Sequence, residues 1–235
     1  MSYQDIREQD SAVSRSGLGD RAKFITKTYN HLLGAIFAFV AISFYFYQSG
    51  ISQAIAQWVF SFGAGWMVLL GGFIAASWAA THLAHTSQSK ATQYSSLVGF
   101  IIAEAIIFAP MLLIAANYAS SVIQSAATVT LVGFGILTAI VFYTRKDFSF
   151  LRGILMWAGG LALLAIGAAF IFGFQLGTWF SVGMIGLAGA AILYDTSNVL
   201  HHYPEDRYVG AALQLFASVA MMFWYVLRLF MSGDE

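Results

Sequence analysis

Two acidic residues lie inside long apolar segments of this sequence. Of the 11 acidic residues, only Glu104 and Asp195 fall within such segments, and the others lie in polar stretches. An ionisable group inside a membrane-spanning helix is costly to insert, and it commonly marks a site for a proton or an ion. These two carboxyl groups are therefore the first candidates for chemistry.

Asp195 is followed by polar residues at helical spacing. In the segment "LYDTSNVLHHYPEDRY", Asp195, Asn198 and His202 have the spacing i, i+3, i+7, which places them on one face if the helix extends that far. Such a stripe could hold a proton or a cation at the mouth of a helix bundle. The alternative is that Asp195 is wetted and acts only as a hydrogen-bonding residue at a helix end.

Glu104 precedes a proline within its apolar segment. Because Pro110 leaves a backbone carbonyl without a partner, the two residues could form a polar pocket within the membrane. The alternative is a protonated Glu104 that hydrogen-bonds to another helix.

Histidines lie near the ends of two apolar segments and are expected on one side of the membrane: His82, His85, His201 and His202. Histidine titrates near neutral pH, so a pH-responsive cluster is one interpretation, and solvent-facing side chains are the other. Without Cys, or Glu at ligand spacing, they do not predict a metal site. No nucleophile elbow, metalloprotease helix, phosphate loop or dinucleotide fingerprint is present, so the sequence predicts neither an enzyme nor a cofactor.

The composition is that of an integral membrane protein. The chain has 235 residues, of which 59% are hydrophobic and 9% are charged, whereas soluble domains carry about 25% charged residues. Most of the surface must therefore face lipid. The net charge of zero gives no support for a nucleic-acid partner.

The apolar segments are long enough to cross a membrane as helices, which need about 20 residues each, and too long for barrel strands. They predict an all-α polytopic protein with seven transmembrane helices, at 29–47, 58–81, 94–116, 126–144, 153–174, 179–199 and 209–230. We expect a mostly disordered tail over 1–28, a membrane domain over 29–230 and a short external tail over 231–235.

Basic residues predict the orientation. With seven spans, every Lys and Arg except Arg228 falls in the amino-terminal tail or in the second, fourth or sixth loop. Cytoplasmic loops carry the excess of Lys and Arg. The amino terminus is therefore expected in the cytoplasm and the carboxyl terminus outside.

The sixth span carries small residues at three- and four-residue spacing: Gly183, Gly186, Gly189 and Ala190. Small residues let helix backbones approach closely. This spacing predicts a tightly packed central helix.

Three stretches resemble the Bax inhibitor family, and most closely its bacterial YccA-type branch. They are "YTRKDFSFLRG" in the fourth loop, "AILYDTSNVLH" at the end of the sixth span, and the closing "AALQLFASVAMMFWYVLRLF". The resemblance implies a bundle of seven helices with the last helix in the middle. It also implies location in a bacterial inner membrane.

The resemblance implies two kinds of activity. Some family members act as pH-sensitive calcium leaks, in which an aspartate of the "YDT" segment pairs with a second aspartate in the last helix. Members of the YccA type bind the membrane-anchored protease FtsH and restrain it. Asp195 matches the first aspartate, but Ser218 stands at the second position. The paired-carboxylate calcium gate is therefore incomplete.

Two functions follow from these observations. The first is a YccA-like modulator of FtsH in membrane-protein quality control, with the amino-terminal tail as a handle for the protease. The alternative is a pH-sensitive leak for calcium, which would bind only transiently near Asp195, Ser218, Asn198 and Glu104. The sequence leaves the oligomeric state open.

Overall fold

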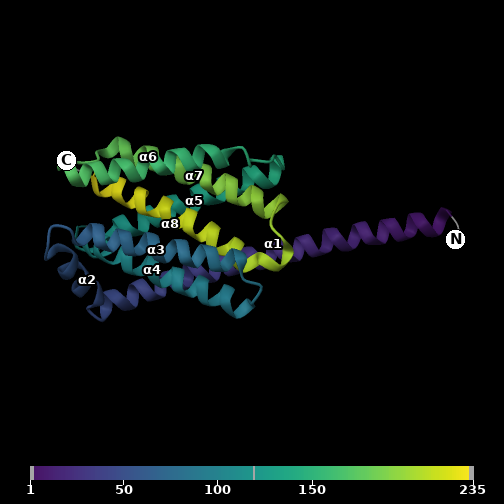
Figure 1. The fold of residues 1–235 in the computed structure, drawn as a ribbon, viewed down its shortest axis with the longest axis horizontal. Helices are drawn as coiled ribbons and strands as arrows, with labels where there is room; N and C mark the ends of the chain where they lie inside the picture. The colour runs from purple at the N-terminus through teal and green to yellow at the C-terminus, as the bar shows by residue number, and fades with distance from the viewer. Residues whose placement is uncertain (1–2, 119, 233–235) are drawn as a thin grey trace.

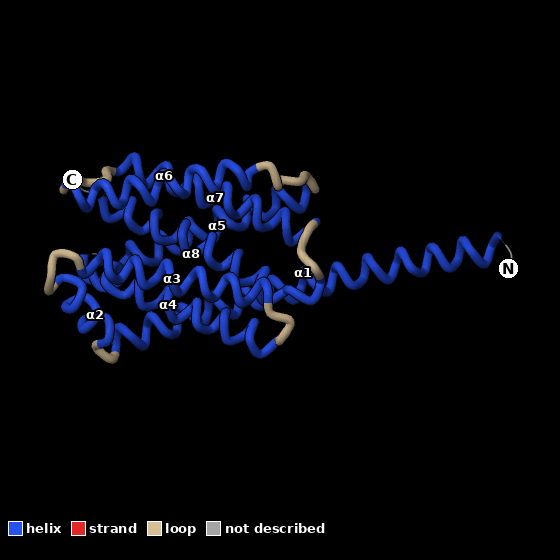
Figure 2. Tube along the Cα trace, in the orientation of Figure 1, coloured by secondary structure: helices blue, strands red, loops and turns tan. Residues whose placement is uncertain are grey.

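The chain is helical throughout the part that the structure, a computed structural model, describes (Figures 1 and 2). It describes the backbone of residues 3–118 and 120–232 and the side chains of residues 19–118 and 121–232. The helices, in order, are α1 (Tyr3–Gln48), α2 (Ile51–Phe60), α3 (Gly65–Thr86), α4 (Lys90–Tyr118), α5 (Ser120–Thr144), α6 (Leu151–Phe172), α7 (Thr178–His201), the short 3₁₀ helix η1 (Glu205–Arg207) and α8 (Tyr208–Ser232).

Seven helices of the described residues are long and apolar enough to cross a membrane, which confirms the predicted all-α polytopic fold. They are α1 from Gly19, α3 to α7, and α8 together with η1. Large apolar side chains remain exposed on the outer surfaces, among them Trp78, Trp157 and Phe172. In a water-soluble protein such a surface would aggregate, whereas in a bilayer it faces lipid.

The last helix occupies the middle of the bundle, as predicted. Helix α8 packs against α1, α3, α4, α5 and α7, and most of its side chains are buried (Figure 1). At its start the approach to α3 is close, because a Cβ atom on Gly210 would lie 3.0 Å from the carbonyl oxygen of Ala84. The element order therefore brings the end of the sequence into the centre of the protein.

The second span begins later than predicted. Trp58 belongs to the short helix α2, and the spanning helix α3 starts at Gly65. The chain turns between these helices so tightly that a Cβ on Gly65 would lie 2.1 Å from the carbonyl oxygen of Val59. A glycine is needed at such a close approach, and the apolar residues on both sides hide this turn from a hydropathy reading.

Helix α1 begins at Tyr3, within the tail that the sequence predicts to be mostly disordered, and that disorder stays a prediction. Figure 1 shows this part of α1 extending away from the bundle. The side chains of residues 1–18 lie outside the described ones, and so do residues 233–235 of the expected external tail. The proposed boundaries of the tails stay a prediction.

The basic segments that were assigned to one side of the membrane meet at one end of the bundle. Lys90 donates a hydrogen bond to the carbonyl of Asp206, and Arg207 donates one to the carbonyl of Ser87. Arg228 lies at the opposite end of α8, beside the α6–α7 loop, where it binds the carbonyl of Leu176. Which end is cytoplasmic stays a prediction.

Candidate functional site

Asp195 lies in the interior of the bundle, near the carboxyl end of α7. Its side chain is 1% exposed, and the neighbouring Thr196 and Ser197 are both fully buried. Ser218 of α8 faces Asp195 and donates a hydrogen bond of 2.5 Å to its Oδ2 atom. The two positions that the family resemblance pairs are therefore in contact, with a hydroxyl in place of the second carboxylate.

No cation accompanies this carboxyl group among the described residues. The ion pairs between described residues involve other acids, and the Asp195 side chain accepts its hydrogen bond from Ser218. One hydroxyl donor compensates only part of the lost hydration of an ionised carboxylate. The geometry therefore suits a group that takes up a proton or a cation.

Three buried hydroxyl groups, one of them on Thr196, which follows Asp195 in the sequence, gather between α1, α5 and α7, and no sequence pattern marks them. The hydroxyls of Thr138 on α5 and Thr196 on α7 lie against that of Tyr29 on α1. None of the three oxygens forms a hydrogen bond of ordinary geometry with a described residue. Buried polar groups normally have partners, so this cluster is suited to an ordered water molecule.

The loop between α5 and α6 covers the end of α7. The backbone N–H of Phe148 donates a 2.9 Å hydrogen bond to Ser197, and the Ser197 hydroxyl lies 3.4 Å from Asp147. Asp147 also pairs with His202 at 2.9 Å. These contacts join "TRKDFSF" to "YDTSNVLHH", so two of the three sequence stretches that carry the family resemblance meet in space.

Asp147 is held in its charged form. A hydrogen bond from the backbone N–H of Ser149, and then one from His202, lower the pKa of Asp147 to about 2. The loop leaves α5 at Arg145, whose φ of 51° is in the left-handed region. That conformation costs roughly 1–2 kcal/mol in a residue with a Cβ, and the contacts of Asp147 and Phe148 help to keep it.

A basic residue of α1 caps the carboxyl end of α7. Arg21 donates hydrogen bonds to the carbonyls of Val199 (2.7 Å) and Leu200 (3.2 Å), and a third to the carbonyl of Tyr203. The last carbonyls of a helix lack partners within the helix, and a cation there also interacts well with the helix dipole. In the sequence Arg21 serves only as a topology signal, because no local pattern predicts a contact between residues 178 apart.

The four histidines do not form one cluster. His202 pairs with Asp147, whereas His85 shares a hydrogen bond of 2.8 Å with the hydroxyl of Tyr203. Burial, together with the nearby Asp195, raises the pKa of Tyr203, which keeps that hydroxyl protonated. His82 is exposed and stacks on Trp78. The described residues hold no group of three His, Cys, Asp or Glu that could bind a metal.

The predicted stripe on α7 is also broken. The helix ends at His201, so His202 turns towards Asp147 while Asp195 turns inward. Asn198 is half-buried and uses its backbone carbonyl to accept hydrogen bonds from the N–H groups of His202 and Tyr203. The three residues therefore do not line one site.

Glu104 lies apart from Asp195. Its side chain is 5% exposed on α4, and no hydrogen bond or ion pair joins it to another described residue. Helix neighbours Phe100 and Phe108 are buried apolar residues, and Pro110 is also buried. The expected polar pocket with Pro110 is therefore not formed by described side chains, and a role for Glu104 stays a prediction.

The small-residue stripe on α7 was assigned the wrong role. A Cβ atom on Gly183 or Gly186 would meet nothing within 4 Å, and both residues are exposed. Gly189 does pack, against Leu137 and Met222, and Ala190 is half-buried. Gly183 and Gly186 therefore lie on the outer face of α7. The central helix of the bundle is α8, which packs against five other helices.

The comparisons with known proteins agree with this architecture. The family profile "Inhibitor of apoptosis-promoting Bax1" matches residues 21–235. Protein PA2604 of Pseudomonas aeruginosa is 37% identical over 121 residues, which cover 49% of this chain and 53% of that protein. The BI1-like protein of Arabidopsis thaliana is 32% identical over 122 residues, 48% of this chain and 46% of the relative.

A further relative is the modulator of FtsH protease YccA from Escherichia coli. It is 36% identical over 89 residues, which are 37% of this chain and 39% of YccA. The chain spans about half the length or less of the curated relatives it matches. The family profile, in contrast, covers nearly all of it, and the chain belongs to the Bax inhibitor family.

Proposed function

We propose that this multi-pass membrane protein is a regulatory protein of the bacterial inner membrane that modulates an FtsH-type protease. The observation that carries the proposal is the length of α1. Helix α1 has 46 residues, whereas the apolar run that is predicted to cross the membrane covers 29–47. Since an α-helix rises 1.5 Å per residue, the preceding turns stand well outside the bilayer, where a protein partner can reach them.

Arg21 connects this outer part of α1 to the buried site. It precedes the apolar run of α1 and donates hydrogen bonds to the carbonyls at the end of α7, about one turn beyond Asp195. A partner that moves the outer part of α1 would therefore act on the end of α7. The name of the E. coli relative, which states modulation of FtsH, supports the choice of partner.

The experiment is a turnover assay in cells that contain the protease. The half-life of a membrane substrate of FtsH is measured with and without overproduction of the full chain. We expect overproduction to lengthen that half-life at least about twofold, and a chain without residues 1–19 to have no effect although it still inserts. An unchanged half-life with well-inserted full chain would contradict the proposal.

The buried pair of Asp195 and Ser218 favours a second function, a pH-sensitive cation leak. A carboxyl group that is 1% exposed and has a single hydroxyl donor is suited to exchange a proton for a cation. Calcium flux into liposomes should then differ between pH 5 and pH 8 for the wild type and lose this difference in Asp195→Asn. Equal flux at both pH values in the wild type would exclude the pH-sensitive leak.

A further inference from the structure

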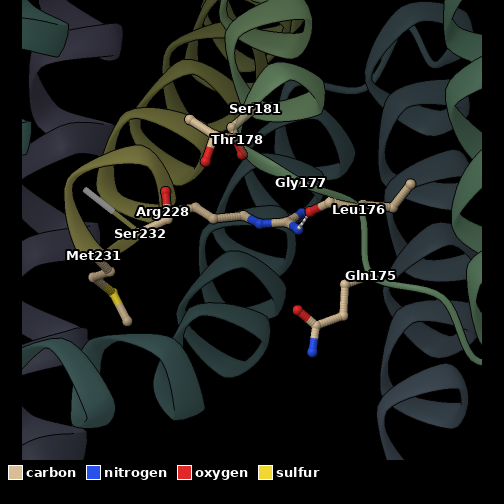
Figure 3. A pocket seen from close by; sticks show the side chains of 8 residues that line it. All are labelled: Gln175, Leu176, Gly177, Thr178, Ser181, Arg228, Met231 and Ser232. Carbon is tan, nitrogen blue, oxygen red and sulfur yellow. Dashed lines mark hydrogen bonds between the residues drawn. The ribbon is translucent and has the colours of Figure 1, made fainter. Parts of the chain in front are cut away.

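A cavity opens at the end of the bundle opposite the Asp147 loop. It has a volume of about 310 Å³ and lies between the α6–α7 loop, the first turn of α7 and the last turns of α8. Polar groups line it, including Gln175, Thr178, Ser181, Arg228 and Ser232. Figure 3 shows Arg228 reaching across the cavity, with Thr178 and Ser181 on one side of its side chain and Gln175 on the other.

The charge in this cavity is positive. The guanidinium of Arg228 donates one hydrogen bond, to the carbonyl of Leu176, and lies 5.9 Å from the ring centroid of Phe180. No ion pair joins Arg228 to an acid among the described residues, and no carboxylate lines the cavity there. A guanidinium has five N–H donors, so most of its capacity is left for a ligand.

The first turn of α7 adds donors to the same cavity. Helix α7 has 24 residues, and no side chain caps its start at Gly177. Its first N–H groups and its dipole therefore favour a negative group at this end. Thr178 contributes a hydroxyl at the first helical position.

A buried hydroxyl in the cavity has no partner within the described part of the chain. Ser181 is 1% exposed, lines the cavity and forms no hydrogen bond with a described residue. Ser49 and Ser61, which also lie at helix ends, do donate to backbone carbonyls, those of Tyr45 and Trp58. An unused hydroxyl beside an arginine and a helix start is the arrangement expected where a ligand completes the hydrogen bonds.

We propose that this cavity binds a phosphate group, held by Arg228, by the hydroxyls of Ser181 and Thr178 and by the amino-terminal turn of α7. Arginine and backbone N–H groups at a helix start match the geometry and charge of an oxyanion. Because the cavity lies at one end of the bundle, where spanning helices reach the bilayer surface, the phosphate has two sources, a lipid headgroup or the free ion. The proposal is independent of the protease and of the Asp195 site.

Thermal unfolding of the purified full chain in a neutral detergent tests the proposal. One arm adds inorganic phosphate and the other adds phosphatidic acid, with phosphate-free diacylglycerol as the lipid control. A ligand that binds the folded chain raises its unfolding midpoint. A rise with inorganic phosphate assigns the free ion, and a rise with phosphatidic acid alone assigns the lipid headgroup. No rise in either arm overturns the proposal.

Variants connect the response to the cavity. Arg228→Gln should weaken phosphate binding at least about tenfold, as expected for the loss of a hydrogen bond to a charged group. Arg152→Gln, the same change at an exposed arginine in α6, should leave binding unchanged. Because Arg228→Gln also removes the bond to Leu176, Ser181→Ala serves as a second variant and should weaken binding several-fold. If both cavity variants respond like the wild type, the site is elsewhere.

The chain itself supplies two competing anions. Asp234 and Glu235 follow Ser232 in the sequence. The titrations are therefore repeated with the double variant Asp234→Asn, Glu235→Gln. We expect both forms to bind phosphate. A response seen only after removal of the two acids would assign the cavity to the acidic end of the chain and overturn the proposal.

Discussion

At the scale of single residues, the pair of Asp195 and Ser218 concentrates the unusual chemistry of this protein. Both side chains are almost fully buried, and one hydrogen bond joins them. Removing one partner of a buried polar pair leaves the other unsatisfied, which costs more than the pair gains by forming. The energetic importance of the contact is therefore measured best by a double-mutant cycle.

We expect Ser218→Ala to lower the free energy of unfolding by about 1–3 kcal/mol, because Asp195 then loses its donor. In the background of Asp195→Leu, which has no carboxylate to satisfy, the same serine change should cost much less. Thermal or denaturant unfolding of the four forms gives the coupling. Additive effects would mean that the hydrogen bond contributes nothing measurable.

The lowered pKa of Asp147, in the loop that packs on the carboxyl end of α7, should make the stability of the protein depend on pH. The pKa of Asp147 is lowered to about 2 by Ser149 and His202. A group whose folded pKa lies below its unfolded value stabilises the fold above the unfolded value, and this stabilisation is lost as pH falls towards the folded pKa. The stability difference between wild type and Asp147→Asn should therefore be constant at neutral pH and shrink between about pH 4 and 2.

The measurement is equilibrium unfolding of both forms over that pH range. Asp20→Asn is the matched control, since Asp20 is exposed and, among the described residues, forms an ion pair only with Lys23 on the same helix. A difference between wild type and Asp147→Asn that stays constant down to pH 2 would contradict the assignment. The same pH dependence of unfolding in Asp147→Asn and Asp20→Asn would also contradict it.

At the scale of helices, packing depends on a small residue outside the predicted small-residue stripe of α7. A Cβ on Gly210 would press on the backbone of Ala84, whereas a Cβ on Gly186 would meet nothing. Gly210→Leu should therefore destabilise the bundle by about 1–3 kcal/mol, and Gly186→Leu should be tolerated. Thermal unfolding of the two variants checks this, and the reverse order would show that α8 and α3 are not packed as described.

The junction of α1 and α7 gives a second test at this scale. Arg21→Gln should expose the end of α7 and speed the hydrogen exchange of its last turn, since three carbonyls lose a charged donor. Lys23→Gln is the matched control, because the exposed Lys23 side chain bonds to Asp20 on the same helix and to no carbonyl of α7 among the described residues. If the last turn of α7 exchanges equally fast in Arg21→Gln and Lys23→Gln, the proposed coupling between α1 and α7 is wrong.

The helices themselves could be predicted from the sequence, and most of the site could not. Hydropathy and charge placed seven spans because each signal is local and repeated over about 20 residues. The turn before Gly65 escaped, since apolar residues flank it on both sides. Contacts such as Phe148 with Ser197 join residues 49 apart in the sequence, and no local pattern encodes them. Asp195 was found because a buried charge is rare, whereas Tyr29 and Thr138 look like ordinary span residues.

At the scale of the whole molecule, the orientation in the membrane is the next prediction. The hydrogen bonds of Arg21, Lys90 and Arg207 gather the basic segments at one end of the bundle. That end should be cytoplasmic, because cytoplasmic loops are rich in Lys and Arg. A reporter fused within 145–152 should read as cytoplasmic, and one fused after Glu235 as external. Both reporters on one side would contradict seven spans.

The central claim is that the outer part of α1 brings a membrane protease to this bundle. Quantitative co-purification tests it most directly, with the tag placed after Glu235 and the protease detected after mild crosslinking in cells. The account predicts that the full chain and Asp195→Asn both recover the FtsH-type protease, and that a chain lacking residues 1–19 recovers at least about tenfold less. Equal recovery by the truncated chain, or no more recovery by the full chain than by an unrelated seven-span protein, would contradict it.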